Sequence, residues 1–197
     1  MRLEHAFQLE RSPGGGVAML DSDELIADAN RATLEVSTPA APDFETARVA
    51  ARAFRGAPHH NPGCFGCGPE RRPGDGLGLA PVACGARDLV ASPWIPDAQW
   101  ADARGIVRPE LVWAALDCPG AYALAHPTMV LLGRIGARID RLPRAGERLR
   151  ALGWRLGREG RKLHVGTALV DEADVAIAVS LAVWIELRPG VWERMGA

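Results

Sequence analysis

The sequence predicts an α+β fold, in which one long helix packs against one antiparallel sheet. Residues 108–125 carry apolar side chains at helical spacing, and long strand-like segments separated by turn signals follow up to residue 187. Composition agrees, because 48% of the 197 residues are hydrophobic and 24% are charged. A chain of this composition can form a packed core, and its hydrophobic content is higher than that of disordered proteins.

Residues 1–37 are expected to form short strands. The stretches "LEHAFQLER" and "GVAML" flank the turn-rich "SPGGG", and "ELIADANRATLEV" follows after "DSD". The strand–acidic turn–strand pattern of residues 18–36 is repeated at residues 168–186. This echo suggests that the N-terminal segment is a second, incomplete copy of the C-terminal one.

Residues 38–63 are expected to form a linker that contains a short helix. The Pro-rich "STPAAP" precedes "DFETARVAARAF", in which Asp43 is a good candidate for the N-cap. Four apolar residues follow at helical spacing: Phe44, Ala47, Ala51 and Phe54.

The main domain is predicted to span residues 64–190. It begins with a strand pair, "LGLAPVACG" and "DLVASPWI", and continues into the long helix, with Pro109 in its first turn. Pro119 inside this helix is expected to kink it or to end its first half. Three long strand segments follow, and the last is predicted to be two strands broken at "DEAD": 127–142, 147–160 and 162–187.

The stretch "HHNPGCFGCGPERRPGDGLGL" at residues 59–79 allows three interpretations: a zinc knuckle, a redox pair, or a structured turn at the start of a domain. Cys64 and Cys67 have the spacing of a zinc knuckle, and His59 or His60 could add a third ligand. A structural zinc ion normally has four ligands, which usually come from a second paired motif.

The two other cysteines, Cys84 and Cys118, do not form such a second pair. A redox role is disfavoured because the Cys-x-x-Cys does not open the helix of a βαβ unit. The sequence therefore predicts no metal site and four reduced thiols. The interpretation it favours is a structured turn that leads into the first strand at residues 76–79.

The order strand, helix, long antiparallel strands resembles the hotdog fold, in which a sheet wraps a central helix. The stretches "CFGCGPERRPGDGLGL" and "VRPELVWAALDCPGAYAL" are similar to the entry and the helix of PaaI-like acyl-CoA thioesterases. The resemblance covers roughly residues 64–187 and includes the three strand segments. The pairing of "CFGCG…GDGLGL" with "WAALDCPG" resembles a group of actinobacterial thioesterase-like proteins.

This resemblance implies a function and an assembly. The implied activity is hydrolysis of an acyl-CoA or acyl-carrier-protein thioester, with no cofactor beyond the coenzyme A of the substrate. Single hotdog units usually pair, so a homodimer with the cleft between protomers is expected. Residues 1–37 would then be the trailing strands of a first hotdog unit that lacks its helix.

Asp117 matches the helix aspartate of that family, which implies that it acts as base or nucleophile. Backbone N–H groups in the first helical turn, near Arg108 and Leu111, are the natural donors to the oxyanion. The family often has His-Gly-Gly at this point, whereas this chain has Arg108-Pro109-Glu110. Glu110 could be an alternative base, and Arg108 could bind a substrate carboxylate or phosphate. A solvated first turn is the competing interpretation.

Two further groups could contact substrate. The hairpin "GREGRKLH" gathers cations that could bind the phosphates of coenzyme A, or could simply keep a strand edge soluble. Trp113, with Trp94, Trp154 and Trp184, could line an acyl pocket, although at least two of the four are expected in the core. The cations of the hairpin are Arg158, Arg161, Lys162 and His164.

Several classes are disfavoured. A net charge of −1 argues against nucleic-acid and membrane-surface binding, and no apolar run reaches the length of a membrane span. The N-terminus lacks a signal peptide, which predicts a cytoplasmic protein. Two alternatives to the thioesterase remain: another hotdog enzyme, such as a dehydratase, decarboxylase or acyltransferase, and a non-catalytic module that binds acyl ligands or CoA. A hydratase-type Asp-x-x-x-x-His is absent, because the fifth residue after Asp117 is Tyr122.

Overall fold

The structure is a computed structural model that describes residues 5–12, 14–56, 61–85, 88–124 and 129–194. The chain divides into two compact units, residues 1–33 and residues 34–197. Residues 34–37, which the sequence groups with the N-terminal strands, therefore lie in the second unit. None of the described helices is long and apolar enough to cross a membrane.

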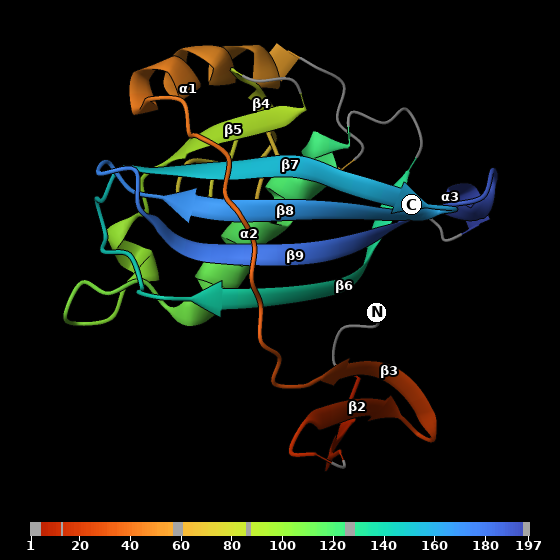
Figure 1. Ribbon diagram of the computed structural model, residues 1–197. Coiled ribbons are helices and arrows are strands. Elements are labelled where there is room, and N and C mark those ends of the chain that lie inside the picture. Colours follow the sequence, from red (N-terminus) through yellow and green to blue (C-terminus); the bar gives the residue numbers. More distant parts are fainter. Residues whose placement is uncertain (1–4, 13, 57–60, 86–87, 125–128, 195–197) are drawn as a thin grey trace. The chain divides into compact units, whose positions relative to one another are not determined.

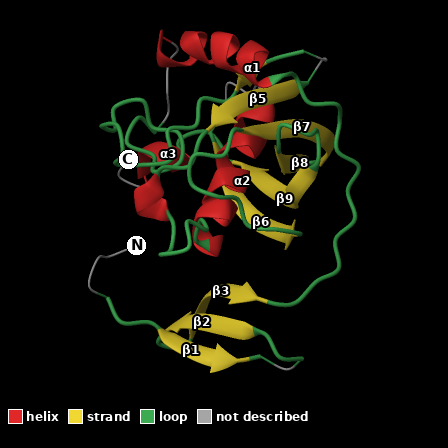
Figure 2. Ribbon diagram, turned by 90° about the vertical axis from the view of Figure 1, so that its left-hand side faces the viewer, coloured by secondary structure: helices red, strands yellow, loops and turns green. Residues whose placement is uncertain are grey.

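The first unit is a three-stranded antiparallel sheet in the order β1-β2-β3 (Figure 2). Gly14 and Gly15 turn the chain between the first two strands with φ angles of 95° and 87°, which glycine adopts without strain. Nearly all strand residues are exposed or half-buried, so this sheet has little core of its own. The strands are β1 (Gln8–Arg11), β2 (Val17–Asp21) and β3 (Glu24–Ala29).

The second unit is a six-stranded antiparallel sheet in the order β4-β5-β7-β8-β9-β6, with helix α2 (Pro109–Ala123) packed on β7 and β8. Figure 1 shows α2 behind the sheet. This arrangement confirms the α+β prediction. The strands are β4 (Val82–Ala83), β5 (Leu89–Trp94), β6 (Val130–Ile139), β7 (Leu149–Glu159), β8 (Lys162–Val170) and β9 (Ala176–Glu186); short helices lie at η2 (Ala98–Trp100) and α3 (Val191–Arg194).

The long strands of the main domain agree with the predicted ones, whereas the N-terminal strands and the start of the domain differ. In the N-terminal segment, β3 ends at Ala29, and residues 30–36, which were expected to continue this strand, belong to no strand. The stretch "LGLAPVACG" contributes only Val82–Ala83 to the sheet, because Pro81 interrupts it and cannot donate a ladder hydrogen bond. The predicted break at "DEAD" is confirmed. There the carboxylate of Asp171 accepts hydrogen bonds from the N–H groups of Ala173 and Val175, both at 3.0 Å, and closes the turn between β8 and β9.

The side chains of β7 alternate between the two faces of the sheet, as expected of a strand buried on both sides. Leu149 and Ala151 belong to the core cluster that contains α2 residues such as Leu116. Leu152 and Trp154 belong to a second cluster on the opposite face of the sheet. The sheet is therefore covered on both faces along its central strands.

The second face is covered by residues 34–43 and by α1 (Phe44–Ala50), which continues into η1 (Ala51–Gly56). Figure 1 shows the extended segment crossing in front of β7, β8 and β9. The segment is held at both ends, since Arg138 donates to the carbonyl of Leu34 at 3.0 Å and Arg150 to that of Pro42 at 3.1 Å. The predicted N-cap is confirmed, because Asp43 accepts from the N–H of Thr46 at 2.8 Å.

Helix α2 does not end at Pro119, although the sequence allowed for a break there. Both Pro119 and Gly120 are buried, and α2 runs without interruption to Ala123. A proline in a helix interior removes one hydrogen bond and costs about 3 kcal/mol in isolation. Here the turn that contains it packs directly on β7 and β8, and this packing keeps the helix continuous.

Candidate functional site

Asp117 lies in the middle of α2 with one carboxylate oxygen, Oδ1, buried and without a hydrogen-bond partner. Burial raises the pKa of Asp117 to about 6, and the negative charge of Cys64 adds to this rise. A carboxylate that is poorly solvated is a stronger proton acceptor than an exposed one. The side chain is therefore suited to accept a proton from water or to attack a carbonyl carbon.

The entry loop, defined here as residues 61–79, packs against α2 beside Asp117. The Sγ atoms of Cys64 and Cys118 are 3.7 Å apart, and these two sulfurs lie within 4.8 Å of the Sγ atom of Cys67. Sequence reasoning missed this cluster because it looked for a second cysteine pair, whereas the structure supplies one cysteine from the helix. His59 and His60, the other ligands considered, lie outside the described residues.

The entry loop is a closed turn, as predicted. Its two arms are joined by hydrogen bonds from the N–H of Leu77 to the carbonyl of Phe65 and from Leu79 to Gly66, both at 2.9 Å. Residues 76–79 belong to no strand of the sheet, however, so the turn leads into the domain through an irregular segment. The turn thereby presents Cys64 to the helix.

Thiol and backbone donors converge on Cys64. The pKa of Cys64 is lowered, first by the hydrogen bond with the Cys118 thiol, then by that with Cys67, and further by the backbone N–H groups of Cys67 and Gly66. The hydrogen bond with Cys64 raises the pKa of Cys118. Cys64 is thus the member of the cluster in which a negative charge is best stabilised.

The first turn of α2 is exposed to solvent. Arg108 is the N-cap residue without a side-chain cap, and its Nε atom lies 3.4 Å from the carboxylate of Glu110. The Arg108 guanidinium also lies 6.0 Å from the ring centre of Trp100. Glu110 is seven residues before Asp117, about 10 Å along the helix axis, so the two carboxylates are separate.

The two apolar residues predicted to contact substrate differ in exposure. Leu111 is buried in the core, whereas Trp113 is 39% exposed. Trp94, Trp154 and Trp184 are all buried, which confirms that at least two of the four tryptophans belong to the core. The indole N–H of Trp184 has no hydrogen-bond partner, and it lies close to the position of a Cβ atom at Gly120, one turn after Asp117.

The cationic hairpin lies at the opposite end of α2 from Arg108. Leu163 of this hairpin packs with Leu124 at the C-terminal end of the helix. Arg158 forms an ion pair with Glu186 at 2.5 Å, and Arg161 donates to the backbone carbonyl of Glu186 at 3.0 Å. Lys162 is exposed and His164 is half-buried. Within one chain, the predicted substrate-binding residues therefore extend from one end of α2 to the other.

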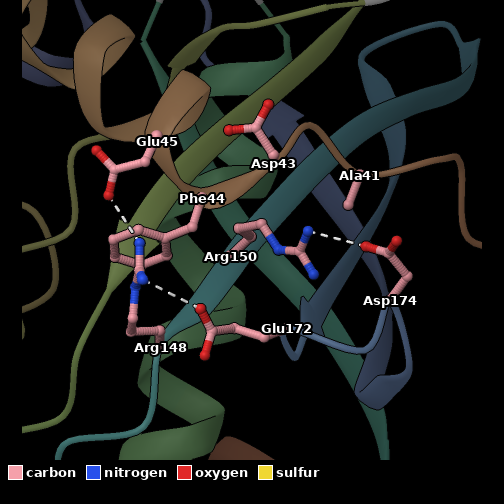
Figure 3. Close-up of a pocket in the computed structure, with 8 residues that line it drawn as sticks. All are labelled: Ala41, Asp43, Phe44, Glu45, Arg148, Arg150, Glu172 and Asp174. Atoms are coloured by element: carbon pink, nitrogen blue, oxygen red, sulfur yellow. Dashed lines mark hydrogen bonds and ion pairs between the residues drawn. The ribbon is translucent and has the colours of Figure 1, made fainter.

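A cleft of about 400 Å³ lies beside α1, away from Asp117 (Figure 3). Arg148 lies 4.2 Å from the ring centre of Phe44 and forms ion pairs with Glu45 at 2.7 Å and Glu172 at 3.2 Å. The other arginine of the cleft, Arg150, forms an ion pair with Asp174. These ion pairs connect α1 to β7 and to the turn that follows β8. A smaller cleft of about 120 Å³ lies beside the entry loop and is lined by Phe54, Phe65 and Cys67 among others.

No protein-family model matches the sequence, and no curated protein matches it. Solved structures do match the fold. The Escherichia coli PaaI protein, from the phenylacetic acid degradation operon, is 12% identical, with a TM-score of 0.54 over 74% of this chain and 96% of that chain. A variant of PaaI from Thermus thermophilus is 19% identical, with a TM-score of 0.50 over 56% and 95%.

A third similar structure is a protein of Streptococcus mutans bound to acetyl CoA. It is 9% identical, and the TM-score is 0.50 over 55% of this chain and 88% of that chain. At identities this low, the structural similarity shows a common fold and nothing further. The chain therefore has the predicted hotdog fold, similar to that of PaaI and other proteins of the hotdog thioesterase superfamily.

Proposed function

We propose that this protein hydrolyses acyl-CoA or acyl-carrier-protein thioesters, with Asp117 as the base or the nucleophile. The observation that carries the proposal is the buried, unpartnered carboxylate oxygen of Asp117 in the middle of the central helix. A buried carboxylate without a partner is costly for stability, and such groups are concentrated at functional sites.

The reaction requires a base and an oxyanion donor around one carbonyl group. As the base, Asp117 takes a proton from water while the water oxygen attacks the thioester carbon, and the thiol leaves with a proton when the tetrahedral intermediate collapses. Backbone N–H groups in the first turn of α2 are suitable donors to the oxyanion. Pro109 supplies none, and the N–H of Leu111 already donates to the carbonyl of Arg108 at 3.1 Å, so the first such donor is the N–H of Glu110.

These donors are about 10 Å from Asp117 along the same helix. This distance is too long for both to act on one carbonyl, because catalytic contacts are made within hydrogen-bond reach or through one water. A second copy of the chain can bring its own helix terminus to Asp117. The separation therefore supports the expected homodimer with a shared cleft.

The substrate contacts in this proposal come from exposed groups. Trp113 is exposed on α2 and can contact an acyl or aryl chain. Lys162, with Arg158, Arg161 and His164 nearby on the hairpin, can attract the phosphates of coenzyme A. Arg108 can contact a charged group of the substrate.

The proposal is tested by following free thiol during incubation with short, medium and aryl acyl-CoAs. Asp117→Asn is expected to lower kcat at least a hundredfold, whereas Asp28→Asn, an exposed carboxylate of the first unit, is expected to leave it unchanged. Glu110→Gln tests the alternative base. Turnover that survives Asp117→Asn but is lost in Glu110→Gln would move the base to Glu110.

The non-catalytic alternative has one observation in its favour. The first turn of α2 carries Arg108 and Glu110 at its surface, and Pro109 removes a possible donor. Calorimetric binding of CoA without turnover of any thioester, on either a CoA or a carrier protein, would favour the binding module over the enzyme.

A further inference from the structure

We propose that Cys64, Cys67 and Cys118 together bind one Zn²⁺ ion. The sequence alone predicted no metal site, so this proposal departs from that expectation. It goes beyond the thioesterase proposal and does not depend on it. The three residues come from two elements, the entry loop and helix α2, so a bound ion joins them.

The spacing of the sulfur atoms agrees with zinc coordination. A tetrahedral zinc ion with Zn–S bonds of about 2.3 Å places its sulfur ligands about 3.8 Å apart. The Sγ atoms of Cys64 and Cys118 are 3.7 Å apart, and the three Sγ atoms are within 4.8 Å of one another. Small rotations of the Cys67 side chain complete the set. One tetrahedral position is left for a water molecule, as in zinc sites with three protein ligands.

Two glycines allow the entry loop to pack tightly against α2 and against itself. A Cβ atom at Gly66 would lie 2.6 Å from the Sγ atom of Cys118, so only glycine lets the helix cysteine approach. A Cβ atom at Gly68 would clash with the backbone of Pro62 and Cys64.

The ligand set and its burial favour zinc over oxygen-seeking ions. Thiolates select Zn²⁺ and other soft metals over Mg²⁺ and Ca²⁺. Cys67 and Cys118 are 7% and 6% exposed, and Cys64 is half-buried. The fourth cysteine, Cys84, is also buried but belongs to the cluster on the other face of the sheet. It is therefore a matched control.

The experiment measures zinc in the untagged full-length protein by elemental mass spectrometry, after purification under reducing conditions without chelator. About one zinc per chain is expected for the wild type and for Cys84→Ser. Cys118→Ser and Cys64→Ser are expected to retain at least tenfold less. In the wild type, replacement of zinc by Co²⁺ is expected to produce a thiolate-to-cobalt charge-transfer band in the near ultraviolet.

Three results would overturn the proposal. One is a reduced wild-type protein that takes up neither Zn²⁺ nor Co²⁺. Another is equal zinc content in Cys84→Ser and Cys118→Ser. The third is a Cys64–Cys118 disulfide in the non-reduced protein together with no zinc in the reduced one, because the cluster would then be a redox pair. The cobalt spectrum needs no variant, so it decides the question even if Cys118→Ser does not fold.

Discussion

Gly153 of β7 lies so close to the carbonyl oxygen of Pro119 in α2 that a Cβ atom at residue 153 would overlap it. The helix backbone therefore rests on the strand backbone at this point, with no side chain between them. The contact lies two residues beyond Asp117. It fixes the height of the helix above the sheet, and with it the position of the candidate base.

Gly153→Ala is expected to destabilise the protein by about 3 kcal/mol or more, because overpacking of a rigid core costs this much when backbone atoms must move. Gly157→Ala in the same strand is the control. A Cβ atom at Gly157 meets nothing within 4 Å, so its free energy of unfolding should stay within about 1 kcal/mol of the wild type. Urea denaturation compares the two variants. Equal stabilities would contradict the close backbone contact.

Sequence periodicity was sufficient to predict the helix, the long strands and the break at "DEAD". These features depend on neighbours within about ten residues, as with the turn formed by Asp171. The contact of Gly153 with Pro119 joins residues that are far apart in the sequence, and a glycine in a strand does not reveal its partner. The uninterrupted helix at Pro119 was missed for the same reason: the packing that holds it comes from β7 and β8.

Arg150→Met is expected to destabilise the second unit by about 3 kcal/mol. The Arg150 side chain is 4% exposed, forms an ion pair with Asp174 at 2.9 Å, and donates to the carbonyls of Pro42 and Asp171. Methionine preserves much of the packing but leaves these acceptors without their donor. Thermal unfolding should show a clear loss for this variant and little change for Arg155→Met, an exposed arginine of the same strand. A similar melting temperature for both would show that Arg150 does not hold residues 34–43 in place.

Arg141 is expected to make the stability of the protein depend on pH. Burial opposes ionisation of Glu147 and Asp171, but hydrogen bonds from Arg141 and from backbone N–H groups outweigh it and lower the pKa of both carboxylates. A lowered folded-state pKa gives stability that is complete above the unfolded pKa values, about 4, and is lost as the pH falls below them. Arg141→Met should therefore be less stable than the wild type at pH 7, by a margin that shrinks at pH 3.

Denaturant titrations at several pH values measure this margin. Arg155→Met serves as the control, because its difference from the wild type should not vary with pH. A constant margin for Arg141→Met between pH 7 and pH 3 would contradict the role of the Arg141 ion pairs.

Less of the candidate site than of the fold could be predicted. Asp117 was identified from the resemblance of "VRPELVWAALDCPGAYAL" to the helix of PaaI-like thioesterases, which carries an aspartate at this position. The cysteine cluster was not found, because Cys64 and Cys118 are separated by 54 residues and only the packing of the entry loop on α2 brings them together. The hairpin cations are neighbours in the sequence, but their distance from Arg108 depends on the length of α2.

The chain is expected to form a dimer through β6, which is an edge strand of the described sheet and pairs only with β9. Leu132 of this strand is 37% exposed, a large apolar side chain at an edge that is open to a second copy. Light scattering should give the wild type twice the 21.0 kDa mass of one chain.

Leu132→Glu should shift the mass toward that of a monomer and lower thioesterase activity in parallel. The reason is that the backbone N–H donors of one chain and Asp117 of the other would no longer meet. Val49→Glu, which changes a more exposed apolar side chain on α1, should leave both the mass and the activity unchanged. A monomeric wild type with full activity would refute the shared cleft.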